Sequence, residues 1–310
     1  MKLLEKLCSI RATSGDEKAM TDFLLNYIEE NKKNWKTQPE IYSGDGFQEA
    51  IVLVFGKPRT AIFAHIDSIG YAVSYKKNMV RIGGPRGKTG WKLVGADSKG
   101  EIECSLRVKW LWDDGNKKEE LKYRFKRVID RGIPLSFKPN FRLKEKTVQS
   151  PYLDNRLGVW NALQTAETME NGAIVFSTYE EVGGGSVQFL ADFLQKKYEV
   201  KQALISDITL ATEAIKPKKG VAISMRDKGI PRQLYLRKII GIAQTNKIPY
   251  QLEVEDAGGS DGTVLQHAPG VWDWCFIGPP EVNYHTPNEK AWKVDIEAMN
   301  NLYKILMKEL

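Results

Sequence analysis

Apolar and polar positions recur along this chain with two periods. Short apolar runs bounded by turn residues are typical of buried strands, whereas apolar residues that recur every three to four positions indicate helices. The predicted strands are residues 50–55, 60–64, 172–178, 202–206, 250–255 and 272–277, and the predicted helices are 1–33 with a break at 12–17, 158–168, 187–197, 231–246 and 294–310. Their alternation predicts an α/β fold, with a mixed, mostly parallel sheet sandwiched by helices.

The pattern changes between Tyr71 and about Val148. Short segments rich in Val, Ile, Leu, Trp and Lys are separated there by turn signals, which lie at 83–85, 113–115 and 131–132. This pattern predicts a small all-β domain, residues 72–147, inserted into a catalytic domain formed by residues 1–71 and 148–310. The two ends of the insert should lie close together, because the parent sheet continues after it.

The break near the N-terminus contains Ser14 and Glu17. The two residues have the spacing of a capping box, in which each side chain bonds the backbone at the start of a helix. We interpret them as the cap of a second helix over 16–31, and this interpretation leaves them no other role.

Composition excludes several classes of protein. The 310 residues are 42% hydrophobic and 27% charged, as is typical of a soluble globular protein. The three cysteines lie far apart, so we expect neither a disulfide framework nor a cysteine zinc site, and a reducing cytoplasm fits. No apolar run approaches the roughly 20 residues of a membrane helix, so we expect no contact with a membrane.

The net charge of +7 is concentrated in the predicted insert. Residues 72–147 contain 20 Lys and Arg and 9 Asp and Glu, a local charge of +11. Such a segment fits nucleic acid, an acidic partner or a solvated face. No nucleic-acid motif accompanies it, so we favour a solvated or subunit-contact face and expect at least a dimer.

Two adjacent carboxylates, Glu180 and Glu181, lie on a glycine-rich turn between a predicted strand and a predicted helix. An isolated Glu-Glu pair is usually a solvated acidic turn. Neighbouring residues on a turn point in different directions, however, so one carboxylate can hold a cation while the other takes a proton from water. The rest of the chain favours this second interpretation.

Further metal-ligand residue types occur at the same kind of place, directly after an apolar strand or just before a helix. Besides Glu181, they are His65, Asp154, Asp207 and His285. Since the carboxyl ends of parallel strands share one edge of a sheet, these five side chains could converge. Imidazole and carboxylate groups bind Zn²⁺, Co²⁺ or Mn²⁺, and five are enough for two ions if one carboxylate bridges. Asp67 is placed to accept the free ring N–H of His65 and to fix its tautomer.

The order and context of these residues resemble the co-catalytic metallopeptidases of the aminopeptidase clan, above all metallopeptidase family 42, the tetrahedral aminopeptidases. Matching motifs span nearly the whole chain, at 14–17, 65–70, 154–158, 180–183, 207, 259–261 and 284–287. The resemblance implies a zinc-aminopeptidase-like fold and a cytoplasmic metallo-aminopeptidase. Such an enzyme removes N-terminal residues from peptide substrates with two divalent metal ions per chain, Zn or Co.

The resemblance also implies roles for the ligands. Asp154 looks like the residue that bridges the two ions. His65 and Asp207 would complete one metal site, and Glu181 and His285 would complete the other.

Other roles follow from the same resemblance. Glu180 would be the general base, with Asp67 as its catalytic neighbour, and Ser260 and Asp261 are candidates for substrate binding. The inserted domain, residues 72–147, would be a dimerisation module, and the assembly would be a dimer or a larger shell.

The chain departs from the family pattern without losing a ligand. The family usually has Asp-Glu where this chain has Asp67-Ser68, Asp-Asp where it has Asp154-Asn155, and an Arg where it has Val282.

Three alternatives stay open. One is a family 28-like aminopeptidase or another dinuclear metal amidohydrolase, which the 89 positions between His65 and Asp154 disfavour. An endoglucanase that acts through paired carboxylates has no need of the histidines and is less favoured. A binding protein with a decayed site is opposed by the intact ligand set.

Overall fold

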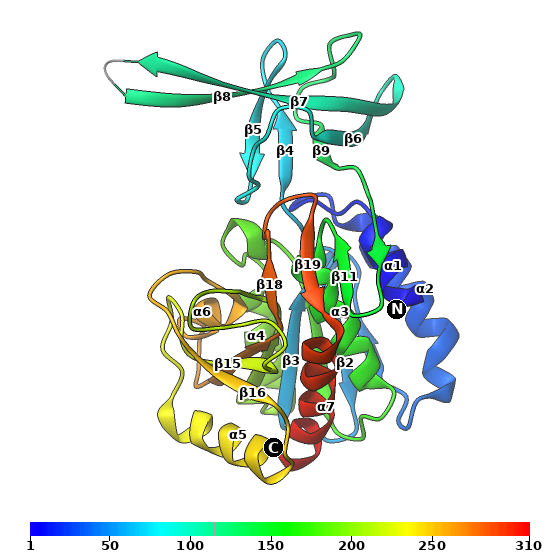
Figure 1. The fold of residues 1–310 in the computed structure, drawn as a ribbon. Coiled ribbons are helices and arrows are strands. Elements are labelled where there is room, and N and C mark those ends of the chain that lie inside the picture. The colour runs from blue at the N-terminus through cyan, green and yellow to red at the C-terminus, as the bar shows by residue number, and fades with distance from the viewer. Residues whose placement is uncertain (114–115) are drawn as a thin grey trace.

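The computed structural model describes residues 1–113 and 116–310. Figure 1 shows a lower body built around a central sheet, with a barrel of strands above it. The central sheet has eight strands in the order β1-β2-β12-β3-β13-β17-β15-β16. Their bounds are Glu40–Tyr42 (β1), Ile51–Phe55 (β2), Thr60–His65 (β3), Gly172–Ser177 (β12), Gln202–Ser206 (β13), Val221–Arg226 (β15), Tyr250–Val254 (β16) and Asp273–Gly278 (β17).

The middle of this sheet is parallel. β12, β3, β13 and β17 are neighbours that run in the same direction. β2 runs antiparallel to both of its neighbours, and β15 runs antiparallel to β17 but parallel to β16. The sheet is therefore mixed, and the predicted α/β class is confirmed. Because the central strands end on the same side, the residues that follow them meet at one edge of the sheet.

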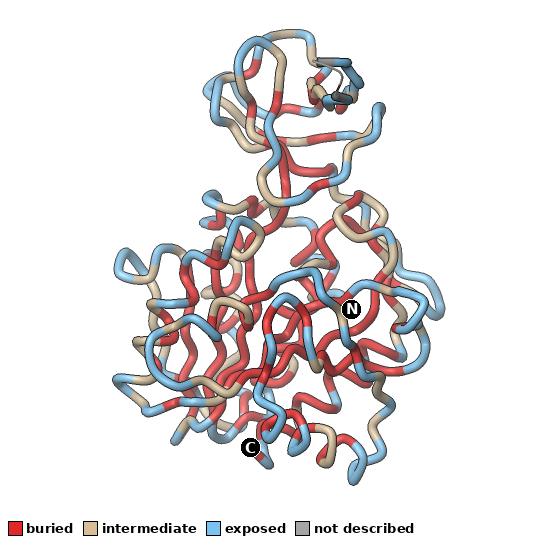
Figure 2. The backbone as a smooth tube through the Cα atoms, turned by 90° about the vertical axis from the view of Figure 1, so that its left-hand side faces the viewer, coloured by how far each residue is buried: buried red, intermediate tan, exposed pale blue. Residues whose placement is uncertain are grey.

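Helices cover both faces of the central sheet. Their bounds are Lys2–Ser9 (α1), Lys18–Asn31 (α2), Leu153–Ala166 (α3), Val187–Tyr198 (α4), Gln233–Thr245 (α5), Asp261–Leu265 (α6) and Lys293–Glu309 (α7). Ile62 and Ala64 of β3 share a core with α1, α2, α3, α5 and α7, whereas Ala61 and Phe63 share a core with α4 and α6. Successive residues of a strand face opposite sides, so a strand covered on both faces must be apolar throughout. Figure 2 shows the resulting concentration of buried positions in the lower body.

The barrel closes in the order β4-β5-β8-β7-β6-β9. Its strands are Gly70–Val73 (β4), Asn78–Ile82 (β5), Lys92–Asp97 (β6), Gly100–Asp113 (β7), Asn116–Arg124 (β8) and Pro134–Phe137 (β9). It has a hydrophobic core of its own. The predicted turns at 83–85 and 131–132 lie between strands, while the one at 113–115 includes residues 114–115, outside the described part of the chain.

A second, five-stranded sheet follows the barrel in the order β10-β11-β19-β18-β14, and the pattern of apolar residues did not predict it. Its strands are Arg142–Leu143 (β10), Thr147–Ser150 (β11), Thr209–Leu210 (β14), Pro280–Val282 (β18) and Glu289–Trp292 (β19). These strands are only two to four residues long, too short for a periodic signal. The remaining short helices are Lys32–Asn34 (η1), Asp45–Phe47 (η2) and Glu180–Val182 (η3).

The predicted capping box is wrong. Helix α2 begins at Lys18, and its N-terminus makes no side-chain cap hydrogen bond. Ser14 pairs instead with the end of β3, because its N–H bonds the carbonyl of Ser68 and its hydroxyl donates to Asp67 Oδ2 at 2.6 Å. The Ser14 hydroxyl therefore bonds a distant residue, Asp67, and does not cap α2. None of the helices in the two described ranges is long and apolar enough to cross a membrane.

Candidate active site and metal centre

Four of the predicted site residues lie at the carboxyl ends of three parallel central strands. His65 is the last residue of β3 and is 1% exposed. Glu180 and Glu181 lie in η3, just after β12, and Asp207 directly follows β13. In the sheet order β12-β3-β13, these strand ends are adjacent. The central sheet therefore brings an imidazole and three carboxylates together.

Asp154 and His285 reach the same edge from outside the central sheet. Asp154 is near the start of α3, where its backbone and that of Asn155 are not helical. His285 lies in the turn between β18 and β19 with a φ of 58°, a left-handed conformation that is uncommon for a residue with a side chain. Its Nδ1 lies 2.9 Å from the carbonyl oxygen of Gly84, which can only accept a hydrogen bond. In the neutral ring, Nδ1 therefore carries the proton, and Nε2 has the free lone pair that a metal ion needs.

Asp154 stands between two groups of ligand atoms. Its Oδ1 lies 3.2 Å from His65 Nε2, and Asp207 Oδ2 lies 3.5 Å from the same nitrogen. Its Oδ2 lies 3.3 Å from His285 Nε2, and Glu181 Oε2 lies 3.7 Å from that nitrogen. Within each group the ligand atoms lie within 4.8 Å of one another, so each could hold a metal ion.

The donor atoms fit divalent cations. Both groups contain imidazole nitrogen and carboxylate oxygen, the ligands that suit Zn²⁺, Co²⁺ and Mn²⁺. Among the described residues, the ring nitrogens of His65 and Oε1 of Glu181 are buried without a hydrogen-bond partner of good geometry. Buried polar atoms are rarely left unpaired, and buried carboxylates that crowd together need positive charge nearby. A bound cation would satisfy both requirements.

Burial and mutual repulsion set the protonation of this cluster. Burial raises the pKa of Glu180 and Glu181 well above the ordinary range, and that of Asp207 to about 6. Burial alone would lower the pKa of His65, but the surrounding carboxylates, above all Asp207, raise it well above its usual value. Burial would raise the pKa of Asp154, yet its two histidine neighbours hold it low. The cluster without metal therefore retains protons that a cation would displace.

Asp67 ties the two sides of the site together. Its side chain is fully buried, and Oδ1 lies 3.3 Å from His65 Nδ1, as expected for a residue that orients this ring. It also accepts hydrogen bonds from the backbone N–H groups of Glu180 at 3.1 Å and Glu181 at 3.2 Å. Together with the bond from the Ser14 hydroxyl, Asp67 accepts hydrogen bonds from three donors. One carboxylate therefore positions both a ligand ring and the turn that carries the paired glutamates.

Two residues support the site in ways that the sequence pattern does not predict. The pattern indicates a helix cap for Ser14, but its partner is Asp67, 53 positions away. Arg156 is fully buried and donates to the carbonyl of Ile66 at 2.6 Å and to that of Asp67 at 3.3 Å, which holds the chain just beyond β3. The apolar run that follows Arg156 is the signal that could have revealed it, because a charge next to buried positions needs a specific partner.

Glu180 lies beside the ligand groups but belongs to neither. Its Oε2 is 3.8 Å from His65 Nε2. The side chain lines a cavity of about 670 Å³ that also exposes Asp154, Glu181, Asp207 and His285. It thus lines the cavity beside the two ligand groups without being one of the candidate ligands.

The two predicted substrate-binding residues lie differently. Ser260 lines the cavity, and its hydroxyl caps α6 by accepting the N–H of Gly262. Asp261 is 1% exposed, does not line the cavity and accepts a hydrogen bond from Ser177. Burial raises its pKa to about 7. Only Ser260 is positioned to touch a ligand in the cavity.

The inserted segment contributes to the cavity through the loop after β5. Gly84 lines the cavity, and a Cβ built on it would lie 2.9 Å from His285 Nδ1. A Cβ on Gly83, where φ is +65°, would lie 3.1 Å from Glu181 Oε2. Glycine is thus needed at both positions, because any side chain would press on a candidate ligand.

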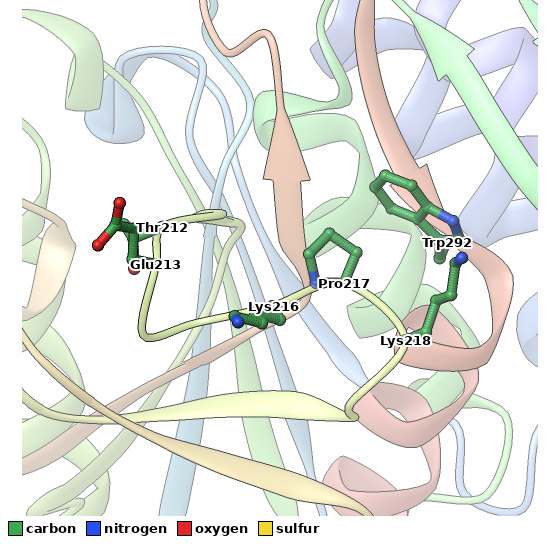
Figure 3. A pocket seen from close by; sticks show the side chains of 6 residues that line it. All are labelled: Thr212, Glu213, Lys216, Pro217, Lys218 and Trp292. Atoms are coloured by element: carbon green, nitrogen blue, oxygen red, sulfur yellow. The ribbon is translucent and has the colours of Figure 1, made fainter.

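A second hollow lies on the outer side of the loop that carries Thr212. Figure 3 shows its lining residues, Thr212, Glu213, Lys216, Pro217, Lys218 and Trp292. It contains no histidine and a single carboxylate, so it lacks a ligand set. Thr212 lines both this hollow and the cavity described above.

An α/β fold whose mixed central sheet has two histidine–carboxylate groups at its edge has the architecture of a metal-dependent hydrolase. Residues 112–302 match the M42 glutamyl aminopeptidase family, and the chain belongs to this family. The predicted resemblance is confirmed, and the chain is a metal-dependent aminopeptidase, a hydrolase that acts on peptide bonds.

Comparisons with individual proteins give the same family of enzymes. The chain is 27% identical over 342 residues to a protein of Acetivibrio thermocellus named "Putative aminopeptidase", covering 99% of this chain and 97% of the relative. An aminopeptidase from the archaeon Desulfurococcus kamchatkensis has a TM-score of 0.87 at 21% identity, covering 100% of this chain and 94% of its own. The TET1 peptidase of Pyrococcus horikoshii, described as assembling into a tetrahedron or a large octahedral shell, has a TM-score of 0.81 at 21% identity, with 100% and 99% covered. Both structures share the fold of this chain.

Proposed function

We propose that this aminopeptidase removes N-terminal residues from peptides with two divalent ions per chain, Zn or Co. His65, Asp154 and Asp207 would hold one ion, and Glu181, His285 and the other oxygen of Asp154 would hold the second. The observation that carries this proposal is the position of Asp154, whose two oxygens face different histidines at 3.2 and 3.3 Å. A carboxylate shared in this way is the usual bridge between paired ions.

The residues of the chain divide the remaining work. When bound, the two ions polarise the substrate carbonyl and acidify water. Glu180 takes a proton from that water and passes it to the leaving amine, which is a poor leaving group unless it is protonated. Asp67 and the Gly84 carbonyl contact Nδ1 of the two imidazoles, so that each Nε2 faces the carboxylates of its ligand group.

Substitution of the paired glutamates tests these roles. Glu180→Gln keeps the shape of the side chain but cannot accept a proton, so we expect turnover to fall by about 10²–10⁴-fold with both ions retained. Glu181→Gln removes a ligand charge, so the protein should bind metal more weakly and regain part of its activity when metal is added. Turnover of an aminoacyl chromogenic substrate and metal content by elemental analysis are measured on both variants.

The matched pair separates a base from a ligand. Near wild-type turnover in Glu180→Gln with metal bound would show that another group moves the proton. Loss of metal from Glu180→Gln would show instead that Glu180 is a ligand, and the assignment across the turn would have to be reversed.

The inserted domain, residues 72–147, is proposed as the dimerisation module and as part of the substrate wall. On β7, Trp110 is 57% exposed and Trp112 is 77% exposed. Figure 1 shows the β7–β8 hairpin extending beyond the rest of the barrel. Large exposed aromatic side chains are typical of interaction surfaces, and the TET1 peptidase assembles into shells. The Gly84 loop supports the second role, because it touches His285 within the cavity.

A cytoplasmic location fits the cysteines. Cys8, Cys104 and Cys275 are all buried free thiols, and burial raises the pKa of each thiol. Such thiols are inert, as expected in a reducing compartment where disulfides do not form. Nucleic acid and membrane are not expected as partners.

A further inference from the structure

Beyond the metal ligands, one wall of the cavity carries acidic side chains that the proposed mechanism does not use. Asp227, Glu253 and Glu255 all line the cavity. They come from the ends of β15 and β16, the pair of strands at one border of the central sheet. Asp227 is 8% exposed and Glu253 is 4% exposed, so two of the three charges are almost fully buried.

These carboxylates are held by neutral groups. Glu253 accepts a hydrogen bond from the Thr209 hydroxyl. Asp227 accepts from the N–H of Gly229 at 2.5 Å and more weakly from the Ser260 hydroxyl at 3.4 Å. None of the three carboxylates forms an ion pair with a Lys, Arg or His of residues 1–113 or 116–310. Among the described residues, the wall thus has no basic side chain paired with its carboxyl groups.

The acidic wall adjoins the place where the N-terminal residue of a substrate must lie. Thr209, which donates to Glu253, is two residues after the candidate ligand Asp207. A substrate with its scissile carbonyl at the metal groups extends its first side chain into the same cavity. The lining of this cavity also includes the apolar side chains of Ile208, Leu210, Val264 and Phe276. The cavity therefore suits an aliphatic stem that ends in a positive charge.

One cationic side chain, Lys228, also lines the cavity. It is exposed, whereas Asp227 and Glu253 are buried. Water and salt screen an exposed charge far more than a buried one, so Lys228 offsets the two buried carboxyl groups only weakly. Burial also raises the pKa of both carboxyls, and a cationic group beside them would favour their charged form.

We propose that this cavity selects peptides whose N-terminal residue is lysine or arginine, with the cationic tip received by Glu253 and Asp227. This inference rests on the aminopeptidase function proposed above and names its substrate class. A glutamyl side chain would add a carboxylate to an already acidic wall, so the preference differs from the one in the family's name. Like charges in a poorly hydrated site repel strongly, which makes glutamyl substrates the worst of the series.

The test compares lysyl, norleucyl and glutamyl p-nitroanilides on the full-length, metal-loaded protein. Lysine and norleucine have nearly the same stem, so the ratio of their kcat/KM values isolates the terminal ammonium. We expect a ratio of about 10 to 100 in favour of lysine, the usual contribution of a hydrogen bond to a charged group. The glutamyl substrate should have the lowest kcat/KM.

Variants then assign the preference to the wall. Glu253→Gln and Asp227→Asn preserve shape and should each move the lysine-to-norleucine ratio toward 1. Glu213→Gln is the matched control. Glu213 is exposed and lines the second hollow, shown in Figure 3, but not the cavity, so the ratio should stay at the wild-type value. Circular dichroism shows whether each variant is folded, and the wild-type ratio tests the inference even if one variant is not.

The outcomes separate this inference from the function on which it rests. If the metal-loaded protein cleaves none of the aminoacyl substrates, the aminopeptidase proposal fails. If its kcat/KM for the norleucyl or glutamyl substrate equals or exceeds that for the lysyl substrate, the aminopeptidase proposal stands and the basic preference is wrong. A lysine preference that persists unchanged in both folded variants would also refute the assignment to Glu253 and Asp227.

Discussion

Replacing Asp67 by Asn tests how far one buried carboxylate organises the active site. Oδ2 of Asp67 accepts hydrogen bonds from the Ser14 hydroxyl and the Glu181 N–H, and Oδ1 accepts from the Glu180 N–H and faces His65 Nδ1 at 3.3 Å. The amide of asparagine has nearly the same shape but only one oxygen. Whichever way it turns, its NH₂ group faces one of the two backbone N–H donors.

The orientation of the amide decides which function is lost. With NH₂ in place of Oδ2, the Ser14 hydroxyl can turn to accept, but the Glu181 N–H loses its acceptor. With NH₂ in place of Oδ1, the Glu180 N–H loses its acceptor and His65 Nδ1 must accept. The proton of His65 then moves to Nε2, the atom that faces Asp154 and Asp207.

Both orientations leave one buried N–H unpaired, which costs about 1–3 kcal/mol of folding stability. Disturbing a group that orients a ligand usually weakens metal affinity by about 10–100-fold. We therefore expect Asp67→Asn to lose stability in that range, to bind divalent cation about 10–100-fold more weakly and to regain activity at high metal concentration. Chemical denaturation gives the free energy of unfolding, and calorimetric titration of cation into metal-free protein gives the affinity.

Ser14→Ala is the control, because it removes one donor but leaves the carboxylate and the His65 tautomer intact. Its stability should fall by about 1 kcal/mol, with metal affinity close to wild type. An Asp67→Asn protein with wild-type stability and cation affinity would refute the conclusion that Asp67 orients His65 and the turn.

The other predictions concern metal, pH and assembly. Metal-replete protein should contain two divalent ions per chain by elemental analysis, and active protein with one ion or none at saturation would overturn the two-ion assignment. Chelation should lower the melting temperature, because each ion present at 100 times its Kd stabilises the folded state by about 2.7 kcal/mol; an unchanged melting temperature would argue against binding at this buried cluster. Metal affinity should decrease as the pH is lowered, because His65, whose pKa is raised well above its usual value, keeps its proton to higher pH than a free imidazole, and Asp207 adds a competing proton below about pH 6; titrations at several pH values that give constant affinity would contradict this sign. Light scattering at micromolar concentration in physiological salt should give at least a dimer, and a monomeric mass would exclude the proposed role of the inserted domain.

The sequence alone determined the main strands and most helices of the lower body. Strands such as β3 and β12 are covered on both faces, so they are apolar throughout and visible as apolar runs. β15 was not predicted, although it lies inside the central sheet. Only its first three residues, Val221 to Ile223, form an apolar run, and its place is set by pairing with β16 and β17. Pairing between distant strands leaves no local signal.

The same division holds for the candidate site. Sequence order alone indicated that His65, Glu181 and Asp207 follow strands, and parallel pairing then brings their side chains to one edge. Only the tertiary structure decided that the two oxygens of Asp154 face different histidines, because His285 arrives on a second sheet that the apolar pattern did not reveal. Arg156 and the carbonyl of Ile66 are 90 positions apart, and their contact exists only once β3 and α3 have packed. A sequence shows which charged and polar groups need a partner, but only packing brings each group into contact with a particular one.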